Sequence, residues 1–285
     1  MEKHKNNTQS RRNFLGNAAA LGIGALGAAH LLHSCKPKVE LNLPPLLDQA
    51  PDGEPLKAGL IGCGGRGTGA AINFINAGPN LQLVAMADVF DDRMTDSRKE
   101  IKDKTGVEVA DENCHIGFDA YKRVIDSDVD VVILATPPYF RPTMFAACVE
   151  ARKHVFMEKP VAVDPVGARS IMSSAKKAET IGLTVITGTQ RHHQRDYIEV
   201  YKRIRQGAIG DIVAANAYWN QSKLWHRDRK PEWDDMEFML RDWVNWNWLS
   251  GDHIVEQHVH NIDVVHWFMG GKFPVKAVGF GSRQR

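Results

Sequence analysis

Short apolar runs alternate with longer mixed segments between residues 56 and 188. Strands that are covered on both faces of a parallel sheet read as continuous apolar runs, and each of these runs stops at a Gly, Asp, Pro or polar residue. The predicted strands cover Leu56–Ile61, Leu81–Ala87, Asp130–Ala135, His154–Met157 and Leu183–Thr187. Helices are predicted around Ala70–Ile75, around Ala146–Arg152, and after Asp164-Pro165, where Asp is the N-cap and Pro opens the first turn. This alternation predicts an α/β fold with a doubly wound parallel sheet.

A glycine-rich loop follows the first predicted strand at once. In Gly62-x-Gly64-x-x-Gly67 the first glycine allows a tight turn, the second lets the backbone approach a pyrophosphate, and the third lets helix and strand pack closely. The pyrophosphate would lie at the helix N-terminus, where free N–H groups favour an anion. The motif has the context that a dinucleotide site requires, since it lies between a strand and a helix.

The second predicted strand ends at Asp88, about 20 residues further on, where a carboxylate binds the adenosine ribose hydroxyls. An acid there favours NAD over NADP, and we interpret Arg93 mainly as a solvated helix charge. The residues expected to contact the cofactor are Gly62, Cys63, Gly64, Gly65, Arg66, Gly67, Asp88, Thr136, Pro137, Glu158 and Lys159.

Composition narrows the class of protein only slightly. The 285 residues carry a formal net charge of +2, so no strong field indicates a nucleic-acid partner. The four cysteines form no Cys-x-x-Cys pair, which argues against a disulfide framework or a structural zinc site. Downstream of the N-terminus, no apolar run reaches the roughly 18–20 residues that span a bilayer.

Residues 1–35 have the features of an export signal and not of a folded segment. Ser10–Leu15 contains the pair Arg11-Arg12, and a small-residue apolar stretch follows, which is typical of a twin-arginine (Tat) signal; a basic amphipathic helix is the alternative. Leu32–Cys35 is similar to a lipobox, so we expect a lipid on Cys35 or, alternatively, cleavage nearby. Residues 36–55 are rich in proline and predict an extended linker. The expected location is the periplasm, either free or lipid-anchored.

Three motifs in order carry a resemblance to a known family. Gly62-Cys63-Gly64, Thr136-Pro137-Pro138 and Glu158-Lys159-Pro160 resemble those of the Gfo/Idh/MocA oxidoreductases. The resemblance implies an NAD(P)-binding Rossmann domain over residues 56–188. It also implies a substrate-binding α+β domain with a mainly antiparallel sheet over residues 189–285. Fewer residues follow Gly188 than such second domains use, so we expect this domain to be incomplete, and relatives commonly form homo-oligomers through it.

The resemblance also implies a catalytic group. In the family, the lysine that matches Lys159 lies beside the nicotinamide and acts with an acid and a histidine of the second domain. His260 matches that histidine, and Glu256 stands where Asp is usual, so its side chain reaches further by a methylene. Either Lys159 or His260 is expected to take the substrate proton. A lysine can do so near neutral pH only where burial or a nearby cation lowers its pKa.

Candidate substrate-binding residues lie in the second half of the chain. All seven tryptophans fall between Trp219 and Trp267, and aromatic faces suit the C–H surfaces of sugars. Trp219 and Trp225 are the preferred cleft residues, whereas Trp267 is expected in the core. Arg191 is predicted to bind substrate or to form an interface salt bridge. Asp263 is predicted to orient His260 or to cap a helix, and no metal is expected.

These observations leave several functions open. The first is an NAD(P)-dependent oxidoreductase that transfers a hydride from a ring hydroxyl of a sugar, glycoside or cyclitol. The second is a glycosidase that acts through transient NAD-dependent oxidation and elimination, since the export signal, glycine loop and histidine segment also look like glycoside hydrolase family 109. The third is a non-catalytic saccharide-binding lipoprotein. Because Tat exports folded proteins, we expect the cofactor, NAD more than NADP, to be tightly bound.

Overall fold

The computed structural model describes residues 41, 43 and 46–282, and residues from 46 onward belong to one compact unit. The predicted export signal, Cys35 and the linker residues 36–40, 42, 44 and 45 lie outside the described residues, so the signal and the lipid on Cys35 stay predictions. Six parallel strands form a sheet in the order β3-β2-β1-β4-β5-β6. The strands are β1 Leu56–Ile61, β2 Leu81–Asp88, β3 Cys114–Ile116, β4 Val131–Leu134, β5 His154–Met157 and β6 Val185–Thr187. The predicted doubly wound parallel sheet is therefore confirmed.

Helices connect these strands in the expected alternation. They are α2 Gly65–Asn76, α3 Asp91–Thr105, α4 Ala120–Asp126, α5 Arg141–Glu150 and α6 Pro165–Thr180, with short 3₁₀ turns η1 Asp111–Asn113 and η2 Pro138–Phe140. Asp164 caps α6 as predicted, since its carboxylate accepts a 2.7 Å hydrogen bond from the Gly167 N–H. Helices α2 and α5 both begin earlier than their apolar residues indicate, because their first turns lie at the sheet edge that forms the site.

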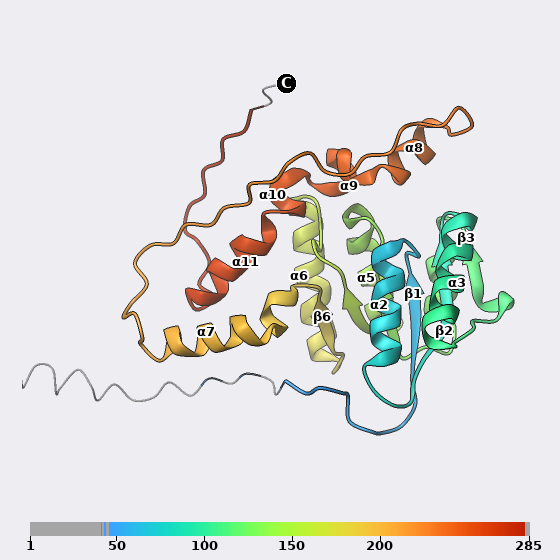
Figure 1. The fold of residues 1–285 in the computed structure, drawn as a ribbon, viewed down its shortest axis with the longest axis horizontal. Coiled ribbons are helices and arrows are strands. Elements are labelled where there is room, and N and C mark those ends of the chain that lie inside the picture. The colour runs from blue at the N-terminus through green and yellow to red at the C-terminus, as the bar shows by residue number, and fades with distance from the viewer. Residues whose placement is uncertain (1–40, 42, 44–45, 283–285) are drawn as a thin grey trace, which may run out of the picture. The chain divides into compact units, whose positions relative to one another are not determined.

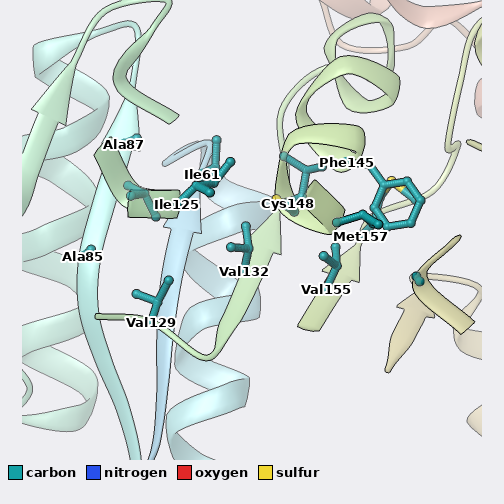
Figure 2. Close-up of a cluster of buried hydrophobic side chains, with 14 of the residues drawn as sticks. Ile61, Ala85, Ala87, Ile125, Val129, Val132, Phe145, Cys148, Val155 and Met157 are labelled. Carbon is teal, nitrogen blue, oxygen red and sulfur yellow. The ribbon is translucent and has the colours of Figure 1, made fainter. Parts of the chain in front are cut away.

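The core lies on both faces of the sheet, as the period-two geometry of strands requires. Along β1, Leu60 packs into the cluster beneath α2 and α3, whereas its neighbour Ile61 packs into the cluster beneath α4, α5 and α6. Figure 2 shows the second cluster, in which side chains of β1, β2, β4 and β5 meet Phe145 and Cys148 of α5. Burial on both faces fixes the strand register and thus the positions of the strand ends.

The chain order places a topological switch point between β1 and β4, whose following connections leave the sheet on opposite sides. In open α/β sheets, ligands bind in the crevice outside the carboxyl ends of the strands at this point. The glycine-rich loop follows β1 and the Thr136-Pro137 turn follows β4, so the fold brings both predicted cofactor segments to this crevice.

The chain after β6 is mainly helical. It contains η3 Gln190–His193, α7 Arg195–Arg205, α8 Asp235–Arg241, η4 Trp243–Asn245, α9 Asn247–Ser250, α10 Asp252–Glu256 and α11 Val259–Phe268. Figure 1 shows α8, α9 and α10 following one another past the end of the sheet where the strands stop. These short helices bring the second half of the chain to the crevice.

The predicted antiparallel sheet has no counterpart among residues 188–282, because no strand is assigned there. Two segments of this part have no assigned helix or strand and expose their apolar side chains: Val213 is 92% exposed and Phe280 is 97% exposed. A strand is held by a paired neighbour and one buried face, and these segments have no such buried face. The second domain and its boundaries therefore stay predictions.

Candidate active site

A cavity of about 800 Å³ opens at the carboxyl ends of the strands. Its walls come from the glycine-rich loop, the ends of β2, β4 and β5, and the helices after β6. Predicted site residues that line it are Gly62, Gly64, Gly65, Arg66, Gly67, Asp88, Thr136, Pro137, Glu158, Lys159, Trp225, Glu256 and His260. Residues predicted from three distant parts of the sequence thus meet in one cavity.

The glycine-rich loop is shaped by close backbone packing. Gly62 has a φ of +97°, which side-chain-bearing residues rarely adopt, and a Cβ on Gly67 would lie 1.8 Å from the Gly62 carbonyl oxygen. No side chain caps the N-terminus of α2, where Gly64 is the N-cap, so its first N–H groups face the cavity without a capping side chain. This cradle fits a dinucleotide pyrophosphate.

Cys63 differs from the prediction: its thiol is buried in the core and only its backbone serves the site.

Asp88 ends β2 in the position expected for a ribose-binding carboxylate. Its two oxygens accept hydrogen bonds from the N–H groups of Cys63, at 2.6 Å, and Phe90, at 2.9 Å. Burial raises the pKa of Asp88, and these N–H groups oppose that rise. Arg93 also lines the cavity, so its interpretation as a solvated helix charge does not describe the structure.

The Glu158-Lys159-Pro160 turn after β5 is held from two sides. The buried Glu158 carboxylate accepts two bonds from Arg66 of the glycine-rich loop, at 2.8 and 2.6 Å. Arg141, at the start of α5, donates one guanidinium nitrogen to the carbonyls of Glu158 and Pro160. Burial lowers the pKa of Arg141 to about 10. Glu158 is therefore a link between the loop and the turn.

Lys159 and Glu256 form a buried pair that joins β5 to α10. The Lys159 Nζ donates to the Glu256 carboxylate at 2.7 Å and to its backbone carbonyl at 2.6 Å, and the two side chains are only 16% and 10% exposed. The longer Glu side chain thus reaches the lysine and orders it.

His260, on the next helix, lines the same cavity and is held as a neutral ring. Burial, together with the cations Lys159 and Arg191, lowers the pKa of His260 to about 4. Its ring stacks on Trp219 with 5.5 Å between centroids. At neutral pH this imidazole is therefore uncharged.

Three predicted substrate residues lie beside the cavity and not in its lining. Arg191 donates to Asn261 and lies over the Trp219 ring, whereas its neighbour Gln190 lines the cavity. Trp219 packs on His260 instead of facing the cavity. Asp263 pairs with His192 at 2.8 Å. Its carboxylate therefore bonds a different histidine from His260, which it was predicted to orient.

Several residues that line the cavity were not predicted from the sequence. They are mostly aromatic or basic side chains: Phe118, Tyr121, Phe140, Arg141, Met144, Gln190, Arg227, Leu240, Arg241 and Trp243. Most of them lie on loops and short helices, where no period marks the side that faces a ligand. Trp267 packs between His192 and Tyr201, in agreement with a packing role.

Within the part of the chain that the structure describes, His, Cys, Asp and Glu side chains form no group of three suited to a metal ion. No helix in that part is long and apolar enough to cross a membrane.

The fold and cavity together define a Rossmann-type dinucleotide-binding domain whose cavity is lined by Lys159. Residues 56–187 match the GFO_IDH_MocA family, which is described as an oxidoreductase family with an NAD-binding Rossmann fold. These residues therefore resemble the NAD-binding Rossmann domains of the Gfo/Idh/MocA oxidoreductases, in agreement with the resemblance that the sequence motifs carry.

Two curated relatives match a longer part of the chain. It is 26% identical over 215 residues to a myo-inositol 2-dehydrogenase of Thermotoga maritima, which covers 75% of this chain and 55% of the relative. It is 28% identical over 249 residues to a glycosyl hydrolase family 109 protein of Solibacter usitatus, which covers 82% of this chain and 51% of the relative. The chain thus spans about half the length of these relatives.

A solved structure shows the same fold. The scyllo-inositol dehydrogenase of Lactobacillus casei, with bound cofactor NAD(H) and scyllo-inositol, is 23% identical with a TM-score of 0.55. The match covers 76% of this chain and 57% of that one.

The depressed pKa of His260 predicts a pH-dependent stability. Below about pH 6.5 the unfolded chain binds a proton at this position, whereas the folded ring stays neutral down to about pH 4. The free energy of unfolding should therefore fall as the pH drops through this window, and His260→Asn should show a shallower fall. Urea unfolding at several pH values measures this. His115, whose pKa burial also lowers, contributes equally to both proteins. Identical pH slopes would contradict the assignment.

Proposed function

We propose that this protein oxidises a ring hydroxyl of a sugar or cyclitol by hydride transfer to NAD. The observation that carries the proposal is the convergence of the Lys159–Glu256 pair, a neutral His260 and the glycine-rich cradle on one cavity. The relatives that are inositol dehydrogenases support the substrate class. Asp88 at the end of β2 supports NAD over NADP.

The side chains divide the work of proton removal. A lysine ammonium has three N–H donors, and Lys159 directs two of its bonds to Glu256, so a third N–H remains to hold a substrate hydroxyl oxygen. His260 then accepts the hydroxyl proton on an imidazole nitrogen. When bound, NAD supplies the acceptor for the carbinol hydride. Of the two bases that the sequence leaves open, the structure therefore favours His260, with Lys159 as the group that orients and polarises the hydroxyl.

We retain export as part of the proposal. Its support is the twin-arginine segment around Arg11 and Arg12 and the lipobox-like residues before Cys35. A protein that acquires NAD in the cytoplasm and works outside it must keep its cofactor, so we propose that NAD stays bound between turnovers and that, in the dehydrogenase route, a second substrate with a carbonyl group takes the hydride back from NADH.

Replacing Lys159 should remove most of the turnover while leaving NAD binding nearly intact. Lys159→Met keeps the length of the side chain but loses the N–H donors, and general acid–base assistance is worth roughly 10²–10⁴-fold. Steady-state rates with a panel of cyclitols and sugars, together with NAD⁺ titration, measure the two effects. Lys153→Met is the matched control, because Lys153 donates to backbone carbonyls of Ser127 and Val129 and does not line the cavity. Wild-type rates in Lys159→Met would reject the role.

A second candidate function has specific support from the family 109 relative. In that route the oxidised hydroxyl acidifies the neighbouring C–H, the aglycone leaves by elimination, and the cofactor is restored within the turnover.

Nitrophenyl glycosides separate the two functions. Without a second, hydride-accepting substrate, a dehydrogenase should convert its bound NAD⁺ to NADH without releasing nitrophenol, because its cofactor ends the half-reaction reduced. The redox glycosidase should release nitrophenol with no net NADH. Parallel absorbance readings of both products decide between them. A protein that binds saccharide but yields neither product would instead be the non-catalytic binding lipoprotein.

A further inference from the structure

The cavity has a second wall that no cofactor motif accounts for. It is formed by residues 225–243, which we call the covering segment. Its lining side chains are Trp225, Arg227, Leu240, Arg241 and Trp243. They share the cavity with Phe90 and Arg93, which directly follow the ribose-side Asp88. The covering segment therefore lies over the end of the cavity where the adenosine is expected.

One arginine attaches the covering segment to the nucleotide-binding half. Arg241 of α8 pairs with both carboxylate oxygens of Asp92, at 2.8 and 3.0 Å, across 149 residues of sequence. The same guanidinium bonds Glu237 at 2.7 Å and lies between the rings of Phe90 and Trp233, at 4.0 and 5.0 Å. Its side chain is only 11% exposed. A bidentate, stacked and buried guanidinium is a geometrically demanding contact that lysine cannot reproduce.

The rest of the covering segment is tied to this attachment. The buried Asp242, next to Arg241, accepts bonds from the Arg227 N–H at 2.8 Å and from the Asn245 side chain at 2.9 Å. Asn245 in turn donates to the Trp225 carbonyl at 3.1 Å. Both ends of the covering segment are thus linked close to Arg241, so a displacement of Arg241 would be passed on to Arg227 and Trp225.

The charges on this wall favour an anionic occupant. Burial lowers the pKa of Arg227, and the neighbouring cations Arg93 and Arg241 lower it further. Three guanidinium groups that face one cavity repel one another, and a dinucleotide between the walls relieves this repulsion. Binding and closure should therefore support each other.

We propose that Arg241 is a positioning residue that keeps the covering segment closed over the adenosine end of the dinucleotide, and that this contact sets a slow rate of cofactor release. The inference rests on the proposed dinucleotide function. It gives a physical basis for a cofactor that is recycled in place, and it makes Trp225 part of the cofactor wall.

The test is the rate at which radiolabelled NAD⁺ leaves the purified protein after dilution into excess unlabelled NAD⁺. Arg241→Met keeps the apolar stem of the side chain but removes the ion pair, and should speed release by about ten-fold, as expected for one partly screened bidentate pair. Asp92→Asn should speed release similarly while leaving the Arg241–Glu237 bond in place, so it serves if Arg241→Met folds poorly. Arg229→Met is the control, because Arg229 pairs with Asp235 within the covering segment and does not line the cavity.

Faster release in both variants, with an unchanged control and an unchanged urea midpoint for Asp92→Asn, supports the proposal. Equal release rates in all four proteins overturn it while leaving NAD⁺ binding, and thus the proposed function, intact. Absence of NAD⁺ binding in the wild type overturns both.

Discussion

The contact between Lys159 and Glu256 is the interaction on which the site depends. It joins the turn after β5 to the end of α10, and it is largely buried. Removing one partner of a buried pair leaves an uncompensated charge and is strongly destabilising. The pair therefore holds the turn after β5 next to the end of α10. Because α11 begins shortly after α10 ends, the same contact also positions His260 at the cavity. The Rossmann sheet positions the glycine-rich loop, and in the proposed function the Lys159–Glu256 pair lies at the end of the cavity where the substrate hydroxyl reacts.

The Lys159–Glu256 pair also affects the charge state of its neighbour in the cavity, His260. Lys159 contributes to the lowered pKa of His260, so the residue that would hold the substrate oxygen in the proposed function also keeps its neighbour uncharged. At the other end of the cavity, the guanidinium groups of Arg93, Arg227 and Arg241 line the wall, and Asp92 pairs with only one of them, Arg241. A dinucleotide that lies between these two ends would be held by contacts from both halves of the chain, which is consistent with a cofactor that stays through turnover.

The sequence predicts the parts of the protein that rest on local periodicity or a spaced motif. Strand positions, the glycine-rich loop, Asp88, Lys159, Glu256 and His260 all follow from such signals. The three-residue β3 was too short to show a pattern. Arg241 was missed because its partner lies 149 residues away, and no local signal marks a long-range ion pair. Trp219 was chosen from the clustering of tryptophans, Arg191 from its place after the last strand and Asp263 from its nearness to His260. In the structure these side chains contact neighbouring side chains.

The most direct test of the central claim is hydride transfer itself. The protein would be incubated with NAD⁺ and cyclitols or glycosides that carry deuterium on their ring carbons, and the nicotinamide would be analysed by mass spectrometry. The account predicts deuterium on the nicotinamide of the wild-type protein, whether or not NADH accumulates. A nicotinamide without deuterium, in a protein that binds both NAD⁺ and the sugar, would contradict it.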